Sequence, residues 1–427
     1  MTAEIAVMNR QAVALAADSA VTIDLPRGQK IYNTVNKLFM LSKYAPVGIM
    51  VYGNANITGV PWETIIKEFR RELDDTRFST VQQYAEAFLS FIESKSTLFP
   101  RDQQAQEVKT HAFGLFNSIL DEVKAELERL FIANGSVREG QVRSVLTRQI
   151  RESLKEIESL PDMSGYTARY RTDLGREFRP EIDQTIELIF EKMPIGTVGK
   201  NRLREVFCSF MSKDAFPNQL SGVVVAGFGE DEHFPSIHSY DAQSVLMGKL
   251  KHKASTNTGS ISANDTAIIV PFAQREMVDL FMRGVAPAYE RAVQVAIDGF
   301  LGGLPDVLID GLPLSKQQRS SLKRKMRAAN QTILAGFDQH LTDYSMMNHV
   351  SPVVNAVATL PKEELAEMAE SLVNLTSFKR RVTMDPETVG GPIDVAVISK
   401  GDGFVWIRRK HYFKPEFNHH FFANYYE

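Results

Sequence analysis

The sequence predicts an α+β fold, in which one layered αββα sheet system is assembled from distant segments. Strand patterns occupy both ends and the middle of the 427-residue chain, and amphipathic helix patterns fill the stretches between them. The composition, 44% hydrophobic and 24% charged, is that of a globular protein with a large core. We find no internal repeat, and we therefore expect one core with helical insertions and not two independent domains.

The first sixty residues predict two β-hairpins followed by a helix. The first hairpin joins residues 5–7 to the apolar run 12–17 through a short polar turn. The second joins residues 37–41 to 47–52, again through a polar turn. A helix is expected to begin within residues 58–63, where a proline comes early and a glutamate stands in the first turn.

The rest of the chain alternates between helix and strand patterns. Apolar residues recur at three- and four-residue steps in long stretches, and short apolar runs bounded by turn residues follow them. The expected parts are the N-terminal part of the core (1–75), a helical insertion (76–214), central strands (215–284), a second helical insertion (285–350), the C-terminal helix and strands of the core (351–412) and an aromatic C-terminal tail (413–427).

The composition excludes several classes of function. With 49 basic and 52 acidic residues the net charge is -3, which argues against a nucleic-acid binder because such proteins carry a basic excess. The nine histidines show no metal-ligand spacing, so we expect no metal and no cofactor. The sequence shows no signal peptide and no window of about 18 consecutive apolar residues. We expect a soluble, cytoplasmic protein that does not bind membranes.

Thr2 is the first candidate for chemistry, because it becomes the N-terminal residue once Met1 is removed. Aminopeptidases that trim the initiator accept small second side chains, so we expect Met1 to be removed. An N-terminal threonine supplies both a nucleophilic hydroxyl and a base, since its free α-amine has an ordinary pKa of about 7.7–8.0.

Such a site needs a cation near the amine, a carboxylate to hold that cation and a backbone N–H for the oxyanion. The chain offers these groups in order at the ends of the expected strands: Asp18, Lys37 and Gly53. Two adjacent hairpins would bring them to one edge of a sheet.

The segments that carry these residues resemble those of the proteasome β-subunit family and of the bacterial proteasome-like peptidases. Residues 12–22, which contain Ala-Ala-Asp-Ser, resemble the family signature, and residues 34–38 resemble the segment of the catalytic lysine. Residues 47–55 look like the strand and the oxyanion glycine, and residues 224–241 like the central hairpin. Residues 362–373 look like the final helix, and residues 389–395 like the Gly-Gly strand. The resemblance covers about half of the chain and implies a four-layer αββα N-terminal-nucleophile (Ntn) hydrolase fold with helical insertions.

The resemblance also implies roles for individual residues. Thr2 would be the nucleophile, Lys37 would lower its proton affinity, Asp18 would hold Lys37, and the Gly53 amide would stabilise the oxyanion. Lys30 is the alternative for the lysine role, because Asp18 and Lys37 are further apart in the sequence than in the family. The remaining implied positions are Asp385 as a supporting aspartate, Thr22 for pairing with an extended substrate, and Val21, Val51 and Ala55 as a small apolar specificity pocket.

The implied activity is that of a threonine peptidase that cleaves peptide or other amide bonds, forms a homo-oligomer and works with an ATP-dependent unfoldase. Two alternatives stay open. One is an amidase of the same fold that acts on a small non-peptide amide. The other is a non-catalytic scaffold or interaction protein, because the serines that support the family's N-terminus are missing here: residues 270–274 contain none, and Val389 stands in place of another.

Overall fold

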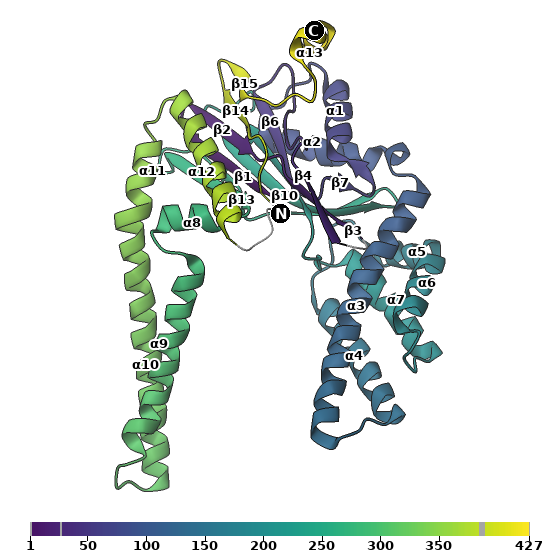
Figure 1. Ribbon diagram of the computed structural model, residues 1–427, viewed down its shortest axis with the longest axis vertical. Coiled ribbons are helices and arrows are strands. Elements are labelled where there is room, and N and C mark those ends of the chain that lie inside the picture. The colour runs from purple at the N-terminus through teal and green to yellow at the C-terminus, as the bar shows by residue number, and fades with distance from the viewer. Residues whose placement is uncertain (1, 26–27, 384–388, 427) are drawn as a thin grey trace.

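Two antiparallel sheets form the body of the molecule, and helices cover their outer faces (Figure 1). The computed structural model describes residues 2–25, 28–383 and 389–426. The α+β class expected from the sequence is confirmed.

The first sheet brings together strands from the start, the middle and the end of the chain. Its order is β13-β1-β2-β14-β15, and every neighbouring pair is antiparallel. The strands are β1 (Ala3–Asn9), β2 (Ala12–Ala17), β13 (Ala267–Ala273), β14 (Asp394–Ser399) and β15 (Gly403–Arg408). β13 runs through Pro271, which an edge strand tolerates because a proline there costs no ladder hydrogen bond.

The second sheet has the order β11-β10-β9-β6-β5, with β12 paired to β10. Its strands are β5 (Leu38–Met40), β6 (Val47–Gly53), β9 (Ser221–Gly227), β10 (Ser236–Leu246), β11 (Lys249–Ala254) and β12 (Gly259–Ser260). Two small hairpins stand apart from these sheets: β3 (Val21–Leu25) with β4 (Gly28–Tyr32), and β7 (Asn56–Ile57) with β8 (Val60–Pro61).

The alternation of side chains along β1 divides the core into two layers. Ala6 and Met8 pack against residues of the second sheet such as Met50. Ile5 and Val7 point the other way and pack with residues of α12 (Lys362–Val382). Because successive side chains of a strand point to opposite faces, even-numbered residues at the start of β1 face the space between the sheets.

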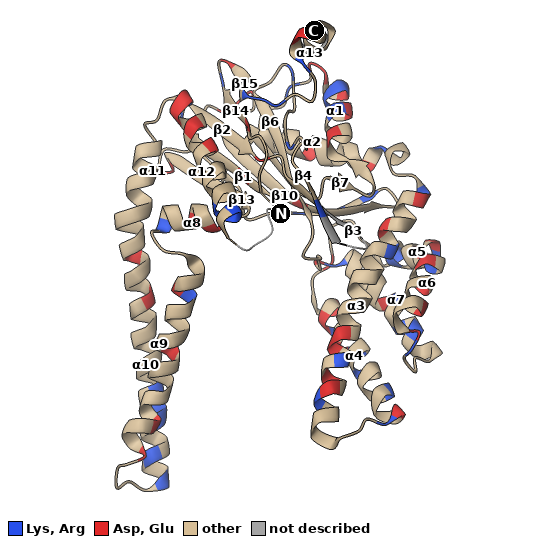
Figure 2. Cartoon of the chain, viewed as in Figure 1, with Lys and Arg blue, Asp and Glu red and all other residues tan. Residues whose placement is uncertain are grey.

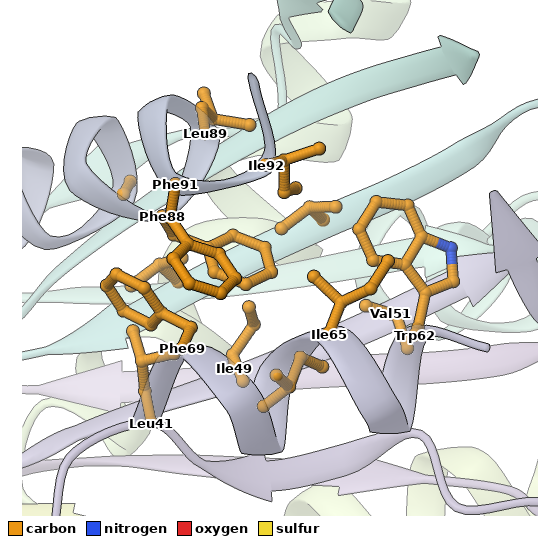
Figure 3. Close-up of a cluster of buried hydrophobic side chains, with 14 of the residues drawn as sticks. Leu41, Ile49, Val51, Trp62, Ile65, Phe69, Phe88, Leu89, Phe91 and Ile92 are labelled. Carbon is orange, nitrogen blue, oxygen red and sulfur yellow. The ribbon is translucent and has the colours of Figure 1, made fainter. Parts of the chain in front are cut away.

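Two helices cover the outer face of the second sheet (Figure 3). They are α1 (Trp62–Leu73) and α2 (Val81–Ser94), whose aromatic side chains Trp62, Phe69 and Phe88 lie over Ile49 and Val51 of β6. Each large apolar side chain buried in this way contributes roughly 1.5–3 kcal/mol. The helix expected to begin within residues 58–63 begins at Trp62, after the short β7–β8 hairpin.

A second helical unit with its own hydrophobic cluster follows α2. Val108, Phe116, Phe178 and Phe207 are fully buried among its helices. These helices are α3 (Arg101–Asn134), α4 (Glu139–Ser159), α5 (Ala168–Glu177), α6 (Arg179–Phe190) and α7 (Thr197–Ser212), after the short 3-10 turn η1 (Ser96–Leu98). Most of the range 76–214 thus packs on itself, whereas α2 packs on the second sheet.

The range 285–350 forms a long helical hairpin that projects from the body (Figure 1). The hairpin consists of α9 (Pro287–Ile309) and α10 (Lys316–Ser345), and Figure 2 shows Lys and Arg gathered toward its far end. By length and composition α9 is, within the described ranges, the one helix that could cross a membrane, although it carries Asp298 and Asp306. The remaining elements are α8 (Glu276–Arg283), the π-helix η2 (Met346–Val350), α11 (Ser351–Val357), the 3-10 turn η3 (Pro415–Phe417) and α13 (His419–Tyr426).

Candidate active site around Thr2

Thr2 lies directly before β1, at the end of the β1–β2 hairpin where Asp18 follows β2. The Asp18 N–H donates to the Ala3 carbonyl (3.1 Å), and the Ala3 N–H donates to Asp18 Oδ1 (3.2 Å). On the other side, the Gln274 N–H donates to the Thr2 carbonyl (3.2 Å). Thr2 is therefore held directly by the bond from Gln274, and indirectly by the two bonds between Asp18 and the adjacent Ala3.

The Thr2 side chain is buried and polar. Its residue surface is 1% exposed, and among the described residues Oγ1 has no hydrogen-bond partner. A buried hydroxyl without a partner costs free energy, so it requires a functional or structural explanation. It also means that residues covering Thr2 must move before a substrate can reach it.

Asp18 and Lys37 form a buried ion pair beside Thr2. The Lys37 ammonium donates to Asp18 Oδ1 at 2.5 Å, and the side chains are 4% and 0% exposed for Lys37 and Asp18. Oδ2 of Asp18 accepts from the Ala20 N–H (3.2 Å) and the Gly390 N–H (2.9 Å). A buried carboxylate is stable only when its oxygens are bonded in this way, and here its partners come from three distant segments.

Lys37, and not Lys30, lies beside Asp18. Lys30 is exposed on β4, where its ammonium lies 4.9 Å from the centre of the Tyr32 ring. The geometry of the described residues thus favours Lys37 of the two lysines considered from the sequence.

Glu4 is a further buried carboxyl that the sequence analysis did not select. It is 1% exposed, and its Oε1 lies 4.0 Å from Lys37 Nζ. Burial raises the pKa of Glu4 well above its ordinary value, and Asp18 raises it further, while Lys37 opposes the shift. The sequence did offer a reason to select Glu4 as a site residue, since it is a charged residue two positions after Thr2 in an apolar run.

Gly53 ends β6 in a conformation that other residues rarely adopt. Its φ is +81°, and a Cβ atom there would lie 1.9 Å from the Leu220 carbonyl oxygen. The strand is tied to the ion pair, because the Val51 N–H donates to the Lys37 carbonyl (2.9 Å). The structure therefore explains why a glycine occupies this position, while the oxyanion role of its amide stays a prediction.

The expected substrate-binding residues divide into two groups. Val21 and Thr22 lie on β3, which among the described residues pairs with β4 alone. Val51 packs in the cluster with α1 and α2, on the opposite face of β6 from Tyr52 (Figure 3). Tyr52 is the side chain of that strand that faces the first sheet, since its ring centre lies 5.7 Å from that of Phe272. Val51 thus lies on the helix-covered face of β6, and Ala55 is exposed beyond the end of that strand, while their role in a specificity pocket stays a prediction.

Asp385 lies outside the described residues. The segment that begins at residue 389 is described, and it contacts the site. Gly390 accepts a hydrogen bond from the Ser19 N–H (3.1 Å), and Ser19 Oγ donates to the Pro392 carbonyl. Val389, which stands where a serine was expected, is 3% exposed. Backbone groups of this segment thus hold Asp18 and Ser19 without a serine side chain.

A second set of contacts that hold Thr2 in position comes from the end of β13 and from α12. Where the sequence lacks the expected serines, Phe272 is fully buried between the sheets, opposite Glu4 in the strand register. Gln274, which bonds the Thr2 carbonyl, accepts a hydrogen bond from Arg380 Nε on α12 (2.7 Å). The position of Thr2 is therefore linked through Gln274 to the helix that covers the first sheet.

Taken together, these residues place a hydroxyl beside a buried lysine–carboxylate pair and a second, more weakly acidic carboxyl. This arrangement can support nucleophilic attack if the Thr2 amine is free to act as a base. No group of three or more His, Cys, Asp or Glu side chains within residues 2–25, 28–383 and 389–426 could hold a metal ion.

Comparison with known proteins gives structural similarity only. No protein-family model matches the chain, and no curated protein matches it. Among solved structures, the chain is similar to a mutant of Anbu from Hyphomicrobium sp. strain MC1, at 8% identity and a TM-score of 0.28, with 100% of this chain and 94% of that one covered. It is similar to Anbu, an ancestral beta-subunit, from Yersinia bercovieri at 8% identity and a TM-score of 0.27, covering 99% and 94%. At these TM-scores the likeness carries no argument about this chain.

Proposed function

We propose that the chain is an Ntn hydrolase of the proteasome type, which cleaves amide bonds of peptides with Thr2 as its nucleophile. The observation that carries the proposal is the buried Lys37–Asp18 pair, joined at 2.5 Å, whose carboxylate also bonds the N–H of Ala3 next to Thr2. A buried ion pair with good geometry costs desolvation, and it is expected where a fixed positive charge serves a function.

The packing of the two sheets supports the four-layer αββα arrangement proposed for this fold. One cluster lies between the sheets, a second between the first sheet and α12, and a third between the second sheet and α1 with α2. These clusters follow the order helix, sheet, sheet, helix.

In the proposed reaction, removal of Met1 leaves Thr2 with a free α-amine. The amine accepts the hydroxyl proton while Oγ1 attacks the substrate carbonyl carbon, and the carbonyl oxygen takes up the negative charge near the Gly53 amide. The amine then gives its proton to the departing nitrogen, which leaves an ester on Thr2. Attack by water on this ester releases the acid and restores the hydroxyl. Lys37 favours the neutral amine throughout, since a nearby cation disfavours a second positive charge.

The free edge of β3 supports the proposed mode of substrate binding. Among the described residues β3 pairs only with β4, so its other edge offers backbone N–H and C=O groups to an extended peptide. Val21 and Thr22 belong to this strand, and we propose that the peptide lies along it.

The test is hydrolysis of fluorogenic peptides with small aliphatic residues before the scissile bond. Turnover by the purified chain should be lost in Thr2→Ala and Lys37→Ala, reduced but present in Thr2→Ser, and unchanged in Lys30→Ala. Full turnover in Thr2→Ala, with folding unchanged by circular dichroism, would refute the assignment. Hydrolysis of small amides but not of peptides would favour the amidase alternative.

The non-catalytic alternative is favoured by one observation, the burial of Thr2 to 1% exposure. If no peptide or amide is hydrolysed and Met1 is retained, the chain is a scaffold of this fold.

We also propose that the chain forms a homo-oligomer through α9. Arg291 and Asp298 are exposed on one face of this helix, two turns apart, and neither forms a salt bridge with a described residue. Val295 between them is 72% exposed. When two copies of α9 pair antiparallel, each Arg291 meets the Asp298 of the second copy, and the two apolar faces cover each other. Cytoplasmic location, expected from the sequence pattern, and an unfoldase partner, implied by the resemblance, are further proposals.

A further inference from the structure

Glu4 is the buried group of the Thr2 site for which the proposed reaction has no use. It lies on the face of β1 that also buries Ala6 and Met8 between the two sheets. By strand alternation Thr2 and Glu4 share this face. Among the described residues neither carboxyl oxygen of Glu4 has a hydrogen-bond partner, so the carboxyl is not a structural anchor like that of Asp18.

Several elements pack against Glu4, and each of the following charged or titratable groups belongs to one of them. Lys37, directly before β5, lies 4.0 Å away, and Asp18 after β2 adds a negative charge. The Thr2 hydroxyl lies close enough to lower the pKa of Glu4 slightly, without reaching hydrogen-bond geometry. Tyr52 of β6 is near enough for Glu4 to raise the pKa of its phenol, and Asp241 of β10 acts on the same phenol.

Charge balance decides which form of Glu4 fits this site. With the Thr2 amine neutral, as the proposed reaction requires, Lys37 and Asp18 cancel each other, so an ionised Glu4 would leave one uncompensated negative charge in a buried place. The described chain contains no other cation paired with Glu4. A neutral carboxyl avoids this cost, which agrees with the direction of its pKa shift.

We propose that Glu4 is a protonation-dependent positioning residue that sets the alkaline limit of the Thr2 site. The proposal rests on the proposed function, in which the Thr2 amine is the base. While Glu4 keeps its proton, the site is neutral and the amine is free to accept the hydroxyl proton. When Glu4 loses its proton, its negative charge favours the ammonium form of Thr2 and opposes the oxyanion of the intermediate.

The test compares the pH dependence of Thr2 acylation in the wild type and in Glu4→Gln, with an irreversible threonine-directed electrophile as the probe. Gln has the shape of a neutral Glu but cannot ionise. In the wild type the labelling rate should pass through a maximum and then fall about tenfold per pH unit on the alkaline side. In Glu4→Gln this alkaline fall should be absent or should begin at a higher pH, while the acidic side stays in place. An identical alkaline fall in both proteins would overturn the role of Glu4.

The outcomes also separate this proposal from the proposed function. Absence of any Thr2 label in the wild type at all pH values would refute the Thr2 nucleophile, and with it both proposals. Normal labelling with identical pH profiles would refute only the role of Glu4.

A second measurement keeps the proposal testable if Glu4→Gln fails to fold. Carbon NMR of wild-type protein with labelled glutamate carboxyl groups follows the ionisation of Glu4 directly. Ionisation at the pH of the alkaline fall supports the proposal. A Glu4 carboxyl that is ionised throughout the pH range of activity contradicts it.

Discussion

Replacing Asp18 by alanine should destabilise the protein more than any other single change at the site. The Asp18 carboxylate accepts hydrogen bonds from the N–H groups of Ala3, Ala20 and Gly390 at 3.2, 3.2 and 2.9 Å, and from Lys37 at 2.5 Å. Its removal leaves Lys37 buried, with only the Glu4 oxygen at 4.0 Å. Breaking a buried pair costs about 3–5 kcal/mol, and each orphaned N–H group costs about 1–3 kcal/mol unless water replaces the carboxylate. Because these terms are not additive, we expect a loss of roughly 4–6 kcal/mol.

A double variant separates the contribution of the Asp18–Lys37 ion pair to stability from that of the three backbone N–H groups that bond Asp18. Lys37→Met leaves the three N–H donors on Asp18, so we expect it to cost less than Asp18→Ala. The double variant Asp18→Ala with Lys37→Met removes both charges, and its loss should be smaller than the sum of the two by at least about 1 kcal/mol.

Urea denaturation followed by circular dichroism measures these free energies of unfolding. The control is Asp75→Ala, an exposed carboxylate whose loss should change the free energy by less than about 0.5 kcal/mol. A loss below about 1 kcal/mol for Asp18→Ala, or strict additivity in the double variant, would refute the reasoning.

Two further predictions concern Gly53 and α9. Gly53→Ala should cost roughly 2–4 kcal/mol in urea denaturation, because its Cβ would lie 1.9 Å from the Leu220 oxygen at a φ of +81°. Gly114→Ala in α3, where a Cβ meets nothing within 4 Å, should instead be neutral or stabilising, and an equal loss in both would contradict the account. In light scattering, Arg291→Asp and Asp298→Arg should each weaken self-association, and the double exchange should restore it; failure of the double variant to restore it would rule out the antiparallel α9 contact.

Much of the fold could be predicted because hydrophobic alternation is a local signal. The hairpins β1–β2 and β5–β6 lie where the sequence predicted them, and β9 pairs with β10 as expected. The β3–β4 hairpin was missed, although Val21, Ile23 and Leu25 alternate with polar residues before a proline and a glycine. The pairing of β13 with β1 was beyond local reasoning, because residues about 260 positions apart in the sequence meet in it.

In the candidate site, too, residues with a local sequence signal could be predicted, whereas contacts between residues far apart in the sequence could not. Asp18 and Lys37 were selected from their positions at strand ends, and the structure joins them at 2.5 Å. Which face of β6 carries Val51 could not be predicted, because strand direction alone does not say which face points to the other sheet, and its pocket role stays a prediction. The role of Gly390 as a donor to Asp18 has no local sequence signal, whereas Glu4 has one that was not used, its charge two positions after Thr2 in an apolar run.

The central claim, that Thr2 is an N-terminal nucleophile, is tested most directly by intact mass spectrometry of the purified chain after incubation with an irreversible threonine-directed electrophile. The account predicts a chain that lacks Met1 and gains one label, located on the N-terminal peptide, whereas Thr2→Ala gains none. A chain that retains Met1, or a label that persists in Thr2→Ala, would contradict it.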